Sequence, residues 1–124
     1  MPHILLIDDD ALLRDTLHQL LALDGHQVTE AADGHLGLER LLKGQRFDLV
    51  ITDMLMPAMD GAQVITEVRR RWPQLPVIAI SGGRRAISPQ FNLDTAQLVG
   101  ATCMLGKPFG RAALQQAVRT ALGG

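Results

Sequence analysis

The sequence predicts an α/β fold, a three-layer sandwich in which helices cover both faces of a five-stranded parallel sheet. Short apolar runs alternate with segments of helical period along all 124 residues, and strict alternation of strand and helix favours parallel strands joined by right-handed crossovers. Most of these runs are apolar throughout, which indicates strands buried on both faces. No repeat or linker divides the chain, so residues 1–124 are expected to form one domain.

The strands are predicted from runs rich in leucine and β-branched residues. Each run is short and is bounded by polar or turn-forming residues, whereas the segments between them have the period of amphipathic helices. Because the strands are joined by helices rather than by tight turns, a parallel arrangement is expected. The predicted strands span residues 3–7, 26–31, 48–52, 76–80 and 102–105.

Five helices are predicted, one after each strand. Four of them carry an apolar stripe at helical spacing, which would face the sheet. Ser88 followed by Pro89 is a helix start signal, so the remaining helix is expected at about residues 89–99. Asp10 and Asp60 directly precede two helices and are expected to cap them. The four stripes are Leu13, Leu17, Leu20 and Leu21; Leu38, Leu41 and Leu42; Ile65, Val68 and Trp72; and Leu114, Val118, Ala121 and Leu122.

Composition excludes several classes of function. Twelve basic side chains against 13 acidic ones provide no bulk attraction to nucleic acid or to a membrane surface. A single cysteine, Cys103, excludes an internal disulfide and suits a reducing compartment. No apolar run approaches the ~20 residues of a membrane span, and the charged run at residues 8–10 argues against a signal peptide. We expect a soluble cytoplasmic protein.

Polar side chains gather where the predicted strands end. Asp8 and Asp9 follow the first strand, Asp53 the third, Ser81 the fourth and Lys107 the fifth. The carboxyl ends of parallel strands meet at one edge of a sheet, near the switch point of its topology, so these side chains are expected to lie together. That edge is the predicted site.

The predicted site has a net charge of −2 when all its groups are ionised. Three negative charges come from Asp8, Asp9 and Asp53, and Lys107 supplies one positive charge. Two carboxylates ~4 Å apart repel by roughly 4 kcal/mol at an effective dielectric near 20, so the cluster should either protonate or hold a metal ion. Oxygen ligands favour Mg²⁺. The alternative for Asp8 and Asp9 is helix capping alone. The methionines after Asp53 are expected to pack rather than bind metal, and four histidines at unrelated spacings predict no metal site.

Four motifs, taken together, carry a family resemblance. They are ILLIDDD, DLVITDMLMPAMDG, PVIAISG and GATCMLGKPF, and they occur in this order over the whole chain. The sequence resembles a response-regulator receiver domain, of the chemotaxis-regulator type, from bacterial two-component signalling. The resemblance implies a flavodoxin-like sheet of strand order 2-1-3-4-5, the order that such receivers share.

The resemblance also implies the chemistry. Asp53 would accept a phosphoryl group from a phosphohistidine of a sensor kinase or of a histidine phosphotransfer protein. Ser81 would donate a hydrogen bond to one phosphoryl oxygen and Lys107 would pair with another, in keeping with the charge stabilisation that phosphoryl transfer needs. The peptide bond between Lys107 and Pro108 would be cis. The domain would not be an enzyme beyond assisting its own phosphorylation and dephosphorylation.

Magnesium is the implied cofactor. By resemblance, Asp9 would bind the ion directly, Asp8 mainly through water, and Asp53 through its carboxylate. The main-chain carbonyl of Leu55 would supply a further ligand. Pro57 and Gly61, in the same loop, would help it to turn while it offers that carbonyl.

The output is expected to be a protein contact. No segment follows the last helix except two glycines, so we expect a single-domain response regulator without an output domain. The alternative is a receiver domain excised from a longer regulator or a hybrid histidine kinase. The contact face would be built from the helix at 89–99, the strand at 102–105 and the last helix, in a monomer or a weak phosphorylation-dependent dimer. Met104 stands where many receivers carry an aromatic switch residue, and the GGRRAISP segment after Ser81 is longer than in compact receivers.

Three rival functions are weighed against this one. A flavin-binding protein of the same architecture would need an amide-rich phosphate loop after the first strand, where Asp8 and Asp9 would repel phosphate. A phosphatase of the haloacid dehalogenase type would carry its nucleophile after the first strand, whereas Asp53 follows the third. A degenerate receiver that only binds a partner is disfavoured because every residue needed for phosphorylation is present.

Overall fold

Five parallel strands form one sheet in the predicted order, β2-β1-β3-β4-β5. The computed structural model describes residues 1–54, 56, 59–81 and 100–123. Each neighbouring pair of strands is parallel, which confirms the predicted sheet. The strands are β1 (His3–Ile7), β2 (Gln27–Ala31), β3 (Leu49–Asp53), β4 (Val77–Ser81) and β5 (Cys103–Gly106).

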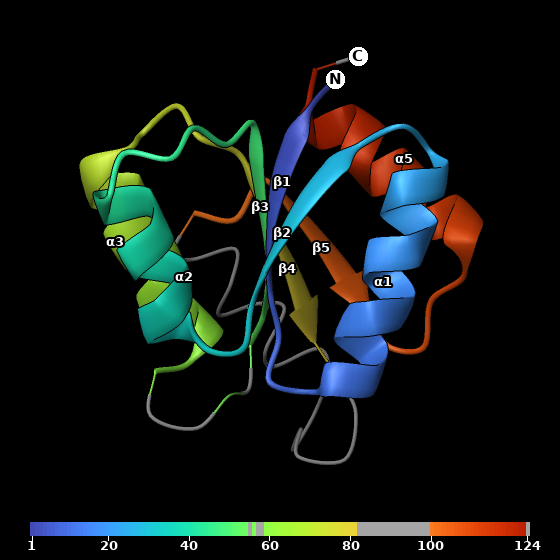
Figure 1. Ribbon diagram of the computed structural model, residues 1–124, viewed down its shortest axis with the longest axis horizontal. Coiled ribbons are helices and arrows are strands. Elements are labelled where there is room, and N and C mark those ends of the chain that lie inside the picture. The colour runs from blue at the N-terminus through green and yellow to red at the C-terminus, as the bar shows by residue number, and fades with distance from the viewer. Residues whose placement is uncertain (55, 57–58, 82–99, 124) are drawn as a thin grey trace.

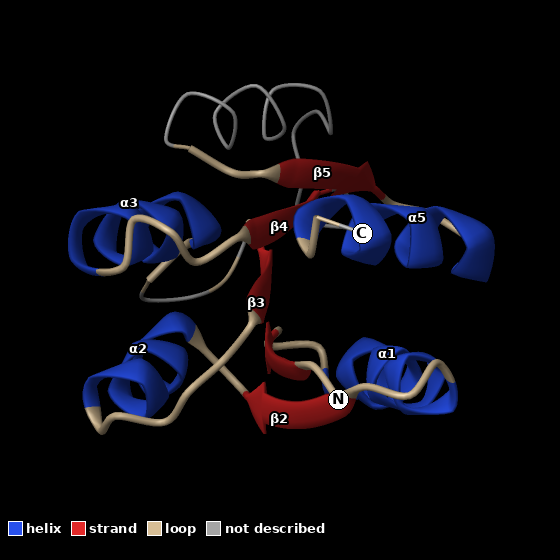
Figure 2. Cartoon of the chain, turned by 90° about the horizontal axis from the view of Figure 1, so that it is seen from above, coloured by secondary structure: helices blue, strands red, loops and turns tan. Residues whose placement is uncertain are grey.

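Helices cover both faces of the sheet. Figure 2 shows α1 and α5 on one face and α2 and α3 on the other, so the molecule has the three predicted layers. The helix predicted at 89–99 lies outside the described residues. No helix in the described part of the chain is both long and apolar enough to cross a membrane. The four described helices are α1 (Ala11–Leu23), α2 (Gly34–Leu42), α3 (Gly61–Arg71) and α5 (Arg111–Ala121).

Side-chain caps begin the helices at the predicted places. The Asp10 carboxylate accepts hydrogen bonds from two main-chain N–H groups in the first turn of α1. Asp60 begins α3 with a capping box, in which its carboxylate accepts from the Gln63 main chain and its own N–H donates to the Gln63 side chain. Both predicted caps are therefore confirmed, and each satisfies N–H groups that a helix start leaves without an intrahelical partner.

Alternate residues of each central strand face opposite layers. In β1, Leu5 and Ile7 pack into the core on the α2 and α3 side, whereas Ile4 and Leu6 pack into the core on the α1 and α5 side. Strands β3 and β4 are likewise buried along their whole length. The uniformly apolar runs therefore correspond to strands covered on both faces, as predicted.

Strand β1 has the predicted bounds. Strand β2 begins one residue later than predicted and ends where predicted, and β3, β4 and β5 each begin and end one residue later. The sheet pairing continues one step further than the apolar runs indicate, because Asp53 pairs with Ile80 and Ser81 pairs with Gly106 in the register of the sheet. Asp53 and Ser81 are thus the last residues of β3 and β4 rather than loop residues after them. Their positions are set by the sheet ladder.

The chain termini and the carboxyl ends of the strands lie at opposite ends of the molecule. In Figure 1 the two labelled termini lie at the top, and the strand arrows point away from them. The polar side chains that follow the strands are therefore gathered at the far end. The candidate site is built there.

Candidate functional site

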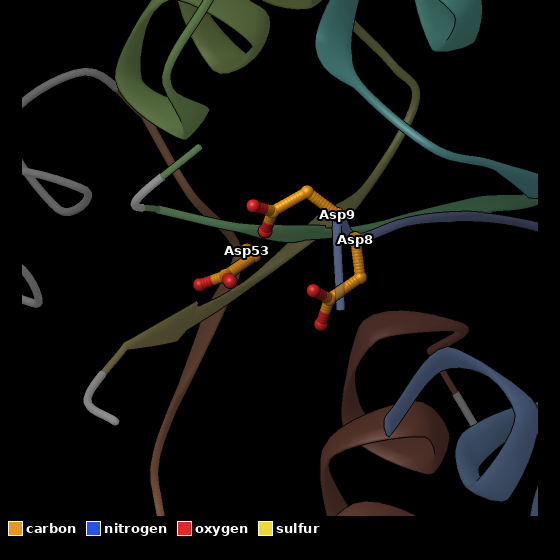
Figure 3. Close-up of side chains that lie close together, drawn as sticks. All are labelled: Asp8, Asp9 and Asp53. Carbon is orange, nitrogen blue, oxygen red and sulfur yellow. The ribbon is translucent and has the colours of Figure 1, made fainter. Parts of the chain in front are cut away.

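Three aspartates meet at the carboxyl ends of β1 and β3. These strands are neighbours in the sheet, so Asp8, directly after β1, comes beside Asp53 at the end of β3. One carboxylate oxygen from each of Asp8, Asp9 and Asp53 lies within 4.8 Å of the other two. Figure 3 shows the three side chains gathered at this edge. The structure thus brings the adjacent pair Asp8 and Asp9 together with Asp53, which follows Asp8 by 45 positions in the sequence.

Asp8 is fully buried, and its surroundings change its ionisation. Its main-chain N–H donates to the carbonyl of Ala31, and its Oδ1 accepts from the N–H of Asp10 at 2.9 Å. Among the described residues, Oδ2 has no hydrogen-bond partner. Burial raises the pKa of the Asp8 carboxyl to about 6, against the opposing N–H of Asp10 and with a further upward contribution from the nearby charge of Asp53.

Lys107 faces the same cluster from the loop after β5. Its Nζ lies 3.5 Å from Oδ2 of Asp53, and only 18% of the lysine side chain and 6% of the aspartate side chain are exposed. The Lys107 N–H donates to the carbonyl of Ser81 at 2.7 Å, which fastens this loop to the end of β4. Ser81 itself is fully buried. The peptide bond between Lys107 and Pro108 is cis, as expected.

Gly61, the first residue of α3, packs directly against the backbone of the site. Its N–H donates to the carbonyl of Met54 at 2.9 Å. A Cβ atom at this position would lie 2.4 Å from the carbonyl oxygen of Asp53 and 2.7 Å from Cα of Met54. Glycine is therefore required by close approach, whereas the sequence interpretation ascribed it to the turn. Met54 and Met56 are buried in the core, as predicted for packing residues.

The donor set fits a hard divalent cation. It offers only oxygen ligands, and three carboxylates face a single nearby ammonium group among the described residues. Such ligands are those that Mg²⁺ prefers. The buried Asp8 Oδ2, which accepts no hydrogen bond from any residue described, would gain a partner from a bound ion. Leu55, the further expected ligand, lies outside the described residues.

Sequence reasoning missed two residues that support Asp8. Arg14, on α1, donates from Nη1 to the main-chain carbonyl of Asp8 at 2.7 Å and from Nε to Glu30 at 2.8 Å. Burial alone would raise the pKa of Glu30, but hydrogen bonds from His18 and Arg14 outweigh it and lower that pKa. The available signal was Glu30 itself, a charged residue within a predicted strand.

The expected output face is only partly described. Met104 on β5 is partly buried and packs against the core on the α2 and α3 side, while Cys103 packs on the opposite side. Strand β5 pairs with β4, so Met104 is the register partner of Ala79, two residues before Ser81. The helix expected at 89–99 and the GGRRAISP segment lie outside the described residues.

Comparison with known proteins finds the same motifs and fold in one family. The model of the response regulator receiver domain matches residues 4–119. The transcriptional regulatory protein AfsQ1 of Streptomyces coelicolor is 36% identical over 122 residues, which are 98% of this chain and 52% of AfsQ1. The chain therefore spans about half the length of that relative.

Solved structures share the fold over the full chain. A response regulator receiver domain protein from Clostridium thermocellum superposes with a TM-score of 0.90 at 30% identity, covering 99% of this chain and 95% of that one. The receiver domain of the sensor histidine kinase PA1611 from Pseudomonas aeruginosa superposes with a TM-score of 0.85 at 29% identity, covering 99% of this chain and 98% of its own. That structure has a magnesium ion coordinated in its active site cleft.

Proposed function

Because the chain belongs to the response regulator receiver domain family, the phosphoacceptor domain of two-component signalling, we propose that Asp53 is the residue that accepts the phosphoryl group. A carboxylate oxygen of Asp53 would attack the phosphorus of a phosphohistidine. An oxygen–phosphorus bond forms as the nitrogen–phosphorus bond breaks, which leaves an acyl phosphate on Asp53 and a free histidine on the donor. The domain acts on its own carboxylate and not on a diffusible substrate.

The neighbouring side chains would stabilise the charge of the transferred group. Lys107, already paired with Asp53, would hold one phosphoryl oxygen, and the Ser81 hydroxyl would donate to another. Asp8, Asp9 and Asp53 would hold Mg²⁺, which would supply further positive charge to the transferred group. Asp8 and Asp9 would otherwise repel an incoming phosphoryl group.

The donor and the target would both be proteins. We propose a histidine kinase or a histidine phosphotransfer protein as donor, as two-component receivers use. Phosphorylation would change the affinity of the face that includes β5 and α5 for a protein partner. The same site would serve equally in a receiver domain within a longer regulator, such as AfsQ1, of which this chain spans 52%.

One observation carries the proposal: Lys107 Nζ lies 3.5 Å from Asp53 Oδ2 within a cluster of three carboxylates. The test is incubation with Mg²⁺ and a small phosphodonor such as acetyl phosphate, followed by mass spectrometry of the intact protein. The wild type should gain the mass of one phosphoryl group, and Asp53→Asn should gain none. Asp15→Asn, on the exposed face of α1, is the matched control and should label like the wild type. Labelling of Asp53→Asn at the wild-type rate would overturn the proposal.

A further inference from the structure

Asp8 is held at three of its polar groups, and each contact comes from a different part of the fold. Its N–H donates to Ala31 at the end of β2, at 3.1 Å. Its Oδ1 accepts from the N–H of Asp10, at 2.9 Å. Its main-chain carbonyl accepts from Arg14 of α1, at 2.7 Å. The remaining oxygen, Oδ2, is buried and accepts no hydrogen bond from the described residues.

Arg14 contacts the Asp8 carbonyl just past the last paired residues of β1 and β2. The register of β1 with β2 ends at the pair of Ile7 and Ala31, so Asp8 is the first residue past the ladder. Arg14 supplies a donor to the carbonyl at that point. Because the carbonyl carbon and Cβ of Asp8 are bonded to the same Cα, a contact that holds the carbonyl also restricts the backbone rotations that would move the Asp8 side chain.

Arg14 is itself held in place. Its Nε donates to Oε1 of Glu30 on β2 at 2.8 Å, and only 18% of its side chain is exposed. The second oxygen of Glu30 is paired with Nδ1 of His18, which lies one turn beyond Arg14 on the same face of α1. A planar guanidinium bound at two of its nitrogens has a defined orientation, which an ammonium group would not have. A chain of hydrogen bonds therefore runs from the His18 side chain on α1, through Glu30 and Arg14, to the main-chain carbonyl of the buried Asp8.

We infer that Arg14 is a positioning residue for the metal site: it fixes the Asp8 peptide and thereby directs Oδ2 toward Asp9 and Asp53, with Glu30 and His18 holding its guanidinium. The inference rests on the proposed function, because it assigns Arg14 a part in Mg²⁺ binding. A purely structural ion pair would contribute to stability and leave the affinity for Mg²⁺ unchanged. Residues that orient metal ligands typically alter metal affinity by about 10- to 100-fold when they are removed.

The test compares Arg14→Ala, Arg14→Lys and Glu30→Gln in the full chain. Mg²⁺ affinity is measured by calorimetric titration, and the initial rate of labelling by acetyl phosphate is measured as a function of Mg²⁺ concentration. Arg14→Ala should weaken Mg²⁺ binding about tenfold or more and raise the Mg²⁺ concentration for half-maximal labelling by the same factor, with the rate at saturating Mg²⁺ largely restored. Arg14→Lys, which keeps the charge but has a single donor nitrogen, should fall between Arg14→Ala and the wild type. Glu30→Gln should have a smaller effect of the same sign.

Arg70→Ala is the matched control, because it also breaks an arginine–glutamate pair at 2.8 Å, the pair with Glu67 on the outer face of α3. It should leave Mg²⁺ affinity unchanged. If Arg14→Ala binds Mg²⁺ as tightly as the Arg70→Ala control, the inference is overturned while the proposed function stands. Should Arg14→Ala not fold, the same outcome in both Arg14→Lys and Glu30→Gln overturns it. A folded wild type that neither binds Mg²⁺ nor becomes labelled overturns the proposed function and this inference with it.

Discussion

Lys107 Nζ lies 3.5 Å from Asp53 Oδ2, so the residue after β5 and the last residue of β3 form an ion pair across the intervening strand β4. Because both side chains are largely buried, this pair is screened less by solvent than the exposed pairs of the surface. The lysine is placed to stabilise negative charge at Asp53, and under the proposed function it would also stabilise the charge of a phosphoryl group there.

The first prediction is that Lys107→Ala slows labelling of Asp53 by acetyl phosphate roughly tenfold at saturating Mg²⁺, since it removes a cation from the charge that develops during transfer. The rate is measured by mass spectrometry of the intact protein over time. Lys43→Ala, which removes an exposed lysine paired with Glu39 on α2, is the control and should label normally. Wild-type labelling of Lys107→Ala would contradict the assigned role.

The second prediction concerns the pH dependence of stability without metal. The pKa of Asp8 is raised from its ordinary value of 3.8 to about 6, chiefly by burial, so between these values the folded protein binds more protons than the unfolded chain. The contribution of Asp8 to the free energy of unfolding should therefore fall as pH rises from about 4 to about 6, by on the order of 2 to 3 kcal/mol, and then level off. Carboxyls whose pKa is lowered by their partners, such as Glu30, contribute in the opposite direction. Urea unfolding at a series of pH values, compared with the same series for Asp8→Asn, isolates the fall that Asp8 causes.

Two variants and the addition of Mg²⁺ test whether the buried Asp8 carboxyl causes this pH dependence. Asp8→Asn should remove most of the fall and should be more stable than the wild type above pH 6, because its neutral amide costs less to bury. Asp15→Asn, on the exposed face of α1, should keep the wild-type pH dependence. Saturating Mg²⁺ should restore stability at neutral pH by binding the folded state. A wild-type pH dependence retained in Asp8→Asn would show that another group is responsible.

The third prediction is that Gly61→Ala disrupts the site through the backbone. The added Cβ would lie 2.4 Å from the carbonyl oxygen of Asp53, and no change of side-chain rotamer can relieve a contact between Cβ and the backbone. We expect a loss of roughly 1 to 3 kcal/mol in the free energy of unfolding, measured in urea, together with slower labelling. Gly110→Ala provides the comparison, since a Cβ there meets nothing within 4 Å. Equal stability and labelling of the two variants would refute the steric argument.

The fold could be predicted because the central strands are buried on both faces. Residues 49–51, for example, are apolar for that reason. The alternation of such runs with helical segments predicts parallel strands, whereas the strand order was predicted from the family resemblance. The ends of β3, β4 and β5 could not be placed to the residue, because the pairing of Asp53 with Ile80 and of Ser81 with Gly106 depends on neighbouring strands rather than on local apolar character. Polar residues can extend a ladder when they lie at its buried end.

The site was predictable where a residue directly follows a strand, as do Asp8 and Lys107. It was not predictable where a side chain reaches it from a helix. Arg14 lies on an otherwise ordinary turn of α1, and its partner Glu30 is 16 residues away on the edge strand. No local pattern relates the two, so their contact with the backbone of Asp8 requires the folded arrangement.

The last prediction is the switch that follows phosphorylation. A phosphoryl group adds roughly −1.5 to −2 charge at Asp53 and should draw in the Ser81 hydroxyl, whose strand pairs with β5 beside Met104. Because methionine is unbranched and flexible, Met104 should follow with little strain, and the active form should be partly populated before phosphorylation. We expect beryllium fluoride with Mg²⁺, a stable phosphoryl mimic, to shift the NMR signals of the Ser81 amide and the Met104 methyl group. Each signal should stay single and lie, in the unmodified protein, between the positions of the inactive and active forms, because the two forms exchange rapidly. Met104→Phe, with a bulkier and stiffer side chain, should give two discrete sets of signals. The methyl group of Met1, which is 87% exposed, is the internal reference and should not move. Shifts confined to residues in contact with Asp53, with Met104 unchanged, would exclude this route from phosphorylation to the β5 face.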